Sequence, residues 1–275
     1  MPGTGLPRQK GARRLRLVQL IPNLMTLGAL CAGLTAMRFA FDGNVFLSVA
    51  LIALAAMLDG LDGAMARLLK SESALGAELD SLADFVNFGV APGLLLYHWA
   101  LQDSRSVGWI AVLIYAVCCA LRLGRYNISA RANPGKKTIY FQGVPAPGGA
   151  LLVLLPVALS RTFPGLVTPV EPPLAAIWLV IVGLLMIARF ATPSLKLLRI
   201  KRENAPLIMV GMIALAAALF TWPWTMLLLI EIGYLAILIR AAISPPKTAP
   251  DEIEDDETIA DDESDTEHHD RDTTA

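Results

Sequence analysis

Long apolar segments separated by short polar connections make up most of this chain. Eight of them come close to the ~20 residues that an α-helix needs to cross the hydrocarbon core of a bilayer. These segments are residues 19–38, 45–67, 78–101, 107–127, 147–162, 172–190, 205–221 and 223–242. Pro223 between two tryptophans favours a tight turn at headgroup depth before the last segment. The pattern predicts an all-α, polytopic membrane helix bundle of about eight transmembrane helices, with a six-helix core as the alternative.

The composition supports a membrane protein, and the charge distribution divides it into parts. The chain is 55% hydrophobic and 17% charged, with a mean hydropathy of +0.56. Residues 251–275 hold 13 of the 24 acidic residues, which leaves 22 basic against 11 acidic residues before them. A basic body suits anionic lipids and anionic substrates. We expect a basic cytoplasmic arm at 1–17, a transmembrane domain at 18–243 and an acidic, disordered cytoplasmic tail at 244–275.

The positions of Lys and Arg predict how the bundle is oriented. With the N-terminus inside, the cytoplasmic segments collect 19 of these residues and the opposite side only Arg38, Arg105 and Arg161. Such asymmetry is typical of a multi-pass membrane protein with both termini in the cytoplasm. The basic arm is therefore interpreted as a membrane anchor, and no nucleic-acid partner is expected.

Four aspartates and one arginine lie beside or within the second and third apolar segments. Charged groups at membrane depth are costly and tend to mark function. Helical spacing places one set on a single face of the second helix, namely Asp59, Asp62, Gly63, Ala66 and Arg67. Asp80 and Asp84 share a face at the start of the third helix, and a short connection makes the two helices antiparallel. We therefore expect the four carboxylates to converge near the cytoplasmic side.

Converging carboxylates would repel one another in a low dielectric unless a cation neutralised them. Ligation by aspartate oxygens alone suits Mg²⁺ or Mn²⁺, and Ca²⁺ is compatible. Gly60, Gly63 and Gly76 leave room for a nucleotide diphosphate, and Arg67 is suited to neutralise phosphate. Packing of small residues between membrane helices is the structural alternative, but such packing does not require four aspartates.

The spacing Asp59-x2-Asp62-Gly63-x2-Ala66-Arg67-x8-Gly76-x3-Asp80-x3-Asp84 is similar to the signature of the CDP-alcohol phosphatidyltransferase family. The resemblance implies a helical membrane enzyme, usually a homodimer, that transfers the phosphatidyl group of CDP-diacylglycerol to a small alcohol and releases CMP. By position, the residues that resemble the family's metal ligands are Asp59, Asp62, Asp80 and Asp84. Those that resemble its CDP-binding face are Asp62, Gly63, Ala66, Arg67 and Gly76. Asp84 also occupies the position of the proposed general base.

Four further stretches resemble bacterial phosphatidylserine synthases of the membrane-embedded type, which implies L-serine as the acceptor and a role in phospholipid biosynthesis. They are residues 21–33, 121–127, 141–147 and 192–196. Glycerol 3-phosphate, inositol phosphate and choline remain alternative acceptors. Arg122, Arg125 and Asn127 are candidates for binding the acceptor or a phosphate, and simple positive-inside anchoring is the alternative for the two arginines. Gly124 stands where alanine is commoner, with no obvious consequence.

Two other classes of function compete with the enzyme. A cation transporter would use the aspartates as a permeation site, but such sites usually lie near the bilayer midplane, whereas these carboxylates lie toward one surface. A scaffold without chemistry would behave independently of metal. Glu231, a carboxylate in the last apolar segment, has no assigned function.

Overall fold

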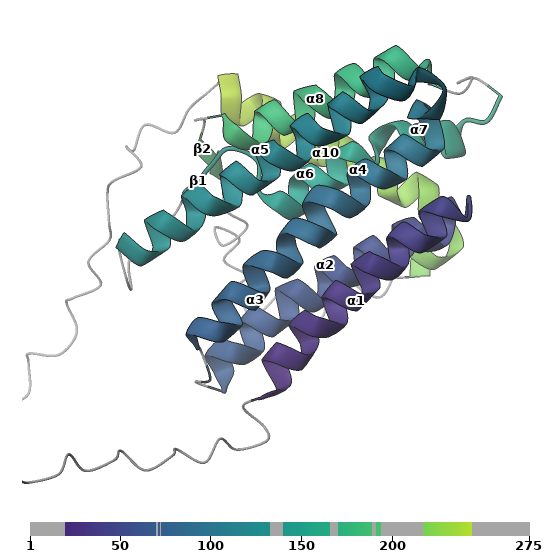
Figure 1. Cartoon of the computed structure of the whole chain (residues 1–275). Coiled ribbons are helices and arrows are strands. Elements are labelled where there is room, and N and C mark those ends of the chain that lie inside the picture. The colour runs from purple at the N-terminus through teal and green to yellow at the C-terminus, as the bar shows by residue number, and fades with distance from the viewer. Residues whose placement is uncertain are drawn as a thin grey trace, which may run out of the picture.

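The computed structural model describes residues 20–69, 71, 73–132, 140–165, 170–188, 191–193 and 217–243. Within these ranges the chain is almost entirely helical, which confirms the predicted fold class (Figure 1). The α-helices are α1 (Ile21–Phe41), α2 (Val45–Leu68), α3 (Ala74–Asp84), α4 (Ala91–Leu96), α5 (Arg105–Ala132), α6 (Ala146–Val153), α7 (Leu155–Thr162), α8 (Pro172–Ile187) and α10 (Pro223–Ile243). Two π-helical segments, Phe85–Val90 and Tyr97–Leu101, flank α4, and a 3-10 turn (Gln102–Ser104) precedes α5.

Seven of the eight predicted spans correspond to described helical segments. In the described part of the chain, five helices are long and apolar enough to cross a membrane: Ile21–Phe41, Val45–Leu68, Ala74–Ser104, Ser106–Ser129 and Pro223–Ile243. Ala146–Thr162 and Pro172–Ile187 are shorter apolar helices. Most of the predicted span 205–221 lies outside the described residues. The chain is thus a multi-pass membrane helix bundle.

The long helices lie side by side along a common direction (Figure 1). Gly43, whose φ is +75°, turns the chain between the antiparallel pair α1 and α2. The continuous run from α3 to α4 packs against α1 on one side and α5 on the other, and α5 packs against α8. π-Helical turns interrupt the usual hydrogen-bond ladder, and the Phe88 carbonyl in such a turn accepts a hydrogen bond of 2.6 Å from the buried Tyr115 hydroxyl of α5. This hydrogen bond connects α5 to the π-helical segment between α3 and α4.

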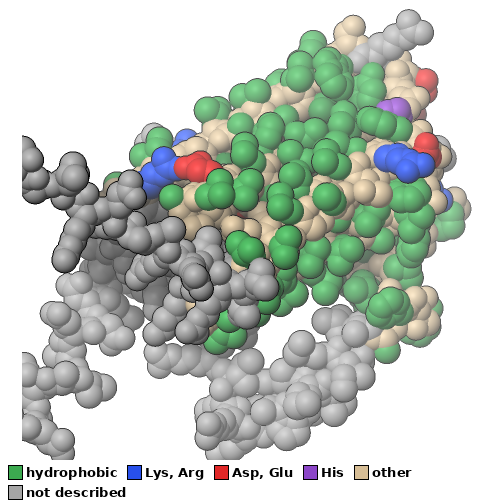
Figure 2. Space-filling view, turned by 60° about the horizontal axis from the view of Figure 1, so that its bottom comes forward, with side chains coloured by type: hydrophobic (Ala, Val, Ile, Leu, Met, Phe, Trp, Pro, Cys, Tyr) green, Lys and Arg blue, Asp and Glu red, His purple; other side chains and the backbone are tan. Residues whose placement is uncertain are grey.

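The outside of the bundle is apolar in its middle and charged at its ends. Figure 2 shows a broad hydrophobic band, with charged side chains near its two margins. Exposed hydrophobic side chains of the bundle include Leu113, Ile177 and Ile239. Exposed apolar area of this extent is costly in water and suits contact with lipid tails.

The structure departs from the predicted pattern around α6. The predicted span 147–162 is divided at Leu154 into α6 and α7, because Pro156 has no N–H to continue the helix. A short antiparallel ribbon, β1 (Tyr140–Gln142) paired with β2 (Ala191–Pro193), adds strands to a bundle predicted to be all-α. Gly143 follows β1 with φ of +72°, and a Cβ there would lie 2.6 Å from the Met186 carbonyl oxygen. Glycine is therefore needed where the chain enters α6 beside the end of α8.

Candidate active site

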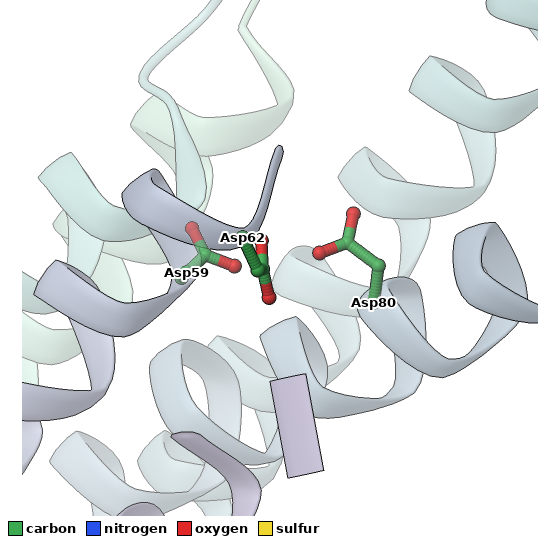
Figure 3. Close-up of side chains that lie close together, drawn as sticks. All are labelled: Asp59, Asp62 and Asp80. Carbon is green, nitrogen blue, oxygen red and sulfur yellow. The ribbon is translucent and has the colours of Figure 1, made fainter. Parts of the chain in front are cut away.

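Three carboxylates meet at the end of the bundle where α1 begins, α2 ends and α3 begins. Asp59 and Asp62 from α2 and Asp80 from α3 point toward one another (Figure 3). One oxygen from each lies within 4.8 Å of the others. Asp62 is only 4% exposed. The helical spacing thus brings three of the four predicted metal ligands into one group, called the aspartate triad below.

The local sequence explains why these helices present the triad to one another. Ser73 caps the start of α3, because its hydroxyl oxygen accepts a hydrogen bond of 3.0 Å from the Gly76 N–H. Two residues before it, the Ser71 N–H donates to the Ala66 carbonyl at 3.0 Å, just after the end of α2. Both α2 and α3 pack against α1. The ends of α2 and α3 are consequently held on opposite sides of a cavity.

This cavity has a volume of about 290 Å³ and lies against the triad. Its lining comprises Pro22, Asn23, Thr26, Asp62, Gly63, Ala66, Arg67, Ser71, Ser73, Gly76, Ala77 and Asp80. All five residues predicted as the CDP-binding face are in this set. A Cβ at Gly76 would lie 2.9 Å from Asn23 Oδ1, so a larger residue would displace the Asn23 side chain from this wall. The exposed Arg67 lies in the wall with its guanidinium close to Gly63.

The first helix contributes residues that the sequence did not reveal as site residues. The Thr26 hydroxyl donates a hydrogen bond of 2.5 Å to Asp62 Oδ2. Asn23 and Pro22, one turn earlier, line the cavity. Residues 21–27 were singled out only as a resemblance, and the one available signal was a polar threonine and asparagine in an apolar helix. The structure shows that α1 supports the buried member of the triad.

Asp84 lies next to the triad rather than within it. It is one helical turn after Asp80 and within charge-interaction range of Asp59, Asp80 and Arg122. Its Oδ1 atom is shielded from solvent and has no hydrogen-bond partner among the described residues. The fourth predicted ligand is therefore adjacent to the other three, with one acceptor atom still available.

The three residues predicted to bind the acceptor have different surroundings. Arg122 lies beside Asp84, and its Nε has no partner in the described part of the chain. Arg125 instead donates from Nη1 to the Ile187 carbonyl at 3.1 Å, and its side chain is exposed. The Asn127 amide donates to Ser81 Oγ at 2.9 Å, close to an ion pair between Arg131 and Glu78. Only Arg122 is thus brought to the aspartates, and a role in acceptor binding stays a prediction for all three.

The chemistry of the triad fits a hard divalent cation. It offers three carboxylate oxygens, and the ion pairs found among the described residues, Arg38–Asp42 and Arg131–Glu78, leave all three triad members without a basic partner. Mutual repulsion of such groups is relieved by a bound cation, and oxygen-only ligation is what Mg²⁺ and Mn²⁺ prefer. The site can therefore hold a metal ion beside a cavity bordered by small residues and an arginine.

The fold, the motif and the site define a class of protein. The profile of the CDP-alcohol phosphatidyltransferase family matches residues 19–188. The chain belongs to this family, whose members use a divalent cation.

Individual relatives carry a more specific name, CDP-diacylglycerol–serine O-phosphatidyltransferase. The Mycobacterium leprae protein of this name is 39% identical over 84% of this chain and 76% of its own length. The Bacillus subtilis protein is 34% identical over 64% of this chain and 91% of its own length. The Helicobacter pylori protein of strain 26695 is 33% identical over 64% of this chain and 73% of its own length.

Proposed function

We propose that this protein transfers the phosphatidyl group from CDP-diacylglycerol to L-serine and releases CMP, as a step of phospholipid biosynthesis. The observation that carries the proposal is the aspartate triad, with its oxygens within 4.8 Å, at the edge of a cavity lined by Gly63, Ala66, Arg67 and Gly76. The relatives named for this reaction support serine as the acceptor.

Asp59, Asp62 and Asp80 hold the divalent cation, with Asp84 as the fourth ligand. Mg²⁺ or Mn²⁺ is the proposed ion, and Ca²⁺ is compatible with the same oxygen set. When bound, the ion supplies positive charge that stabilises the diphosphate and the leaving CMP. Thr26 holds the Asp62 carboxylate in place through its hydrogen bond.

The cavity walls bind the nucleotide end of the donor. Gly63, Ala66 and Gly76 allow the diphosphate to approach the backbone of α2 and α3. Arg67, exposed at the cavity, pairs with phosphate oxygens through its forked N–H groups. The diacylglycerol tails extend into the lipid that surrounds the apolar band.

The transfer breaks the phosphoanhydride bond of the donor and forms a phosphoester bond to the acceptor. The serine hydroxyl oxygen forms a bond to the phosphorus that bears diacylglycerol, and the bond from this phosphorus to the bridging oxygen of the CMP moiety breaks. The electron pair leaves with CMP. The hydroxyl proton passes to the Asp84 carboxylate, whose free Oδ1 is available to accept it. Arg122, within charge-interaction range of Asp84, would bind the acceptor there.

The reaction takes place at the cytoplasmic face of the cell inner membrane. The 19 to 3 distribution of Lys and Arg supports this orientation, and the triad lies at the end of α2 that the orientation assigns to the cytoplasm. We further propose a homodimer, on the basis of the family resemblance. The basic arm 1–17 and the acidic tail 244–275 flank the transmembrane domain, but they lie outside the described residues.

The experiment that tests the proposal is an acceptor comparison on the purified full-length protein. CDP-diacylglycerol in detergent micelles is mixed with Mg²⁺ or Mn²⁺ and one of serine, glycerol 3-phosphate, inositol phosphate or choline, and CMP release is followed. We expect release that depends on serine. Release with another alcohol and none with serine would overturn the assignment of the acceptor, and no release with any alcohol would overturn the enzyme itself.

A further inference from the structure

Three shielded polar atoms from three helices have no hydrogen-bond partners among the described residues. They are Asp84 Oδ1 from α3, Arg122 Nε from α5 and the Tyr234 hydroxyl from α10, each unpartnered among the described residues. Arg122 lies within charge-interaction range of both Asp84 and Tyr234. Buried polar groups are nearly always hydrogen-bonded in folded proteins, and leaving them unpaired is costly. A bound ligand that forms hydrogen bonds with these three groups would remove this cost.

The hydrogen-bonding character of these atoms specifies that ligand. Arg122 Nε can only donate, a phenol hydroxyl can donate, and an ionised Asp84 can only accept. Their complement is a molecule with an anionic acceptor group at one end and a hydroxyl donor at the other. An amino acid with a hydroxyl side chain has both groups.

From this arrangement we infer that Tyr234 binds the carboxylate of the acceptor amino acid beside Arg122, and so selects an alcohol that carries a carboxylate. The inference rests on the proposed serine transferase function and adds a specificity residue to it. Tyr234 lies beyond residues 19–188, the part that matches the family profile. Recognition of the acceptor would thus come from a helix outside the region that carries the common chemistry.

The start of α6 holds the Tyr234 ring in position. A Cβ on Gly148 would overlap the Tyr234 hydroxyl, and it would lie 2.8 Å from Cζ of the ring. The absence of a side chain at this residue therefore lets the phenol reach toward Arg122. This contact also links α10 to the stretch that Pro145 and Pro147 fix at the entry to α6.

The test measures steady-state CMP release by the purified full-length protein and its Tyr234→Phe variant. Phenylalanine keeps the ring and removes only the hydroxyl. We expect KM for serine to rise about tenfold to a hundredfold, as for loss of a hydrogen bond to a charged group, while KM for CDP-diacylglycerol is unchanged. Serinamide has a neutral amide in place of the carboxylate, so its KM should rise less on the same substitution.

Two further variants separate this role from a general disturbance. Tyr126→Phe removes a hydroxyl that also lies near Arg122 but on an exposed residue, so water can replace it and KM for serine should not change. Gly148→Ala retains the hydroxyl but displaces it, and should raise KM for serine in the same direction. If size-exclusion chromatography shows that Tyr234→Phe is misfolded, the KM for serine of Gly148→Ala tests the inference in its place.

Two results would overturn the inference. One is an unchanged KM for serine in a folded Tyr234→Phe protein. The other is a rise in KM for CDP-diacylglycerol instead, which would place Tyr234 on a donor phosphate. Failure of the proposed function looks different, because the wild-type protein would then release no CMP with serine at all.

Discussion

The two ends of the bundle both carry charged and polar side chains, but these side chains differ in burial and in whether they have partners of opposite charge. At the end opposite the triad, Arg38 and Asp42 form an ion pair of 3.8 Å with side chains 79% and 59% exposed. Nearby, the Arg161 guanidinium lies over the Trp224 ring, and these residues border a second cavity of about 480 Å³ with Asp42. At the triad, by contrast, like charges face one another and are partly or fully buried. Exposed charges matched by local partners are compatible with a structural role, whereas buried unmatched carboxylates indicate a ligand.

The comparison also separates two cavities by what their walls can bind. The larger one has an arginine and a single exposed aspartate, and among the described residues no group of three carboxylates able to hold a metal lines it. The smaller one has two triad members, three small residues and Arg67 in its lining. The chemistry of the lining, rather than the size of the cavity, identifies the active site.

Exchanging one aspartate at each end gives the largest expected contrast. Asp84→Asn should lower kcat by about 10²–10⁴-fold, because the amide cannot take up the acceptor's proton. The matched variant Asp42→Asn removes an exposed, paired carboxylate and should leave kcat unchanged. Both proteins should elute as the wild type does on size-exclusion chromatography. Equal rates for the two variants would remove the distinction between the ends.

Two threonines on α1 extend the comparison to residues that act through hydrogen bonds. Thr26→Val removes the hydroxyl that donates to Asp62 and should raise the Mg²⁺ concentration needed for half-maximal activity about 10–100-fold. Among the described residues Thr35 donates to the Cys31 carbonyl of its own helix and contacts no aspartate by hydrogen bond, so Thr35→Val is the control and should not change this Mg²⁺ concentration. A titration of activity with Mg²⁺ checks both. If the two variants behave alike, Thr26 does not support a metal ligand.

Substitutions at two glycines test whether donor binding needs the close packing of the cavity wall. In Gly76→Ala the new Cβ would lie 2.9 Å from Asn23 Oδ1, so Asn23 must shift, and KM for CDP-diacylglycerol should rise about tenfold. Gly124 has nothing within 4 Å of an added Cβ. Gly124→Ala should keep the kinetics and stabilise α5 by about 1 kcal/mol, from helix propensity. A normal KM in Gly76→Ala would show that the donor does not use this wall.

The smallest effect is expected from a charged pair at the same end as the triad. Glu78→Gln removes the ion pair with Arg131, in which both side chains are more than half exposed. Thermal unfolding should change by less than about 1 kcal/mol, and the rate of CMP release should stay at the wild-type value. A large loss of activity would mean that proximity to the site, rather than unmatched burial, determines function at this end.

The sequence predicts well those features that depend on a fixed helical period. The spacing of Asp59 and Asp62 places both on one face of α2 whatever the rest of the chain does, and the short connection brings Asp80 opposite them. The spans follow from hydropathy for the same reason, since bilayer thickness sets their length. These features needed no tertiary information.

Contacts between distant segments could not be predicted in this way. Thr26 and Asp62 are 36 residues apart, and their hydrogen bond depends on how α1 packs on α2. Arg122 and Arg125 share a helical face, yet Arg122 lies beside Asp84 whereas Arg125 donates to the Ile187 carbonyl. The β1–β2 ribbon has three residues in each strand, too few for a strand pattern to be recognised among apolar helices. The helical period determines which residues share a face, but it does not determine which segment packs against that face.

The most direct test of the account is the metal dependence of CMP release by wild-type protein and by Asp80→Asn, with CDP-diacylglycerol and serine as substrates. After treatment with a chelator, the wild-type rate should fall to background and return when Mg²⁺ or Mn²⁺ is added. The Asp80→Asn protein should need far more metal or fail to recover, because one of the three triad carboxylates is gone. A wild-type rate that is unaffected by the chelator would contradict the assignment of the triad as the metal site of a phosphatidyl transferase.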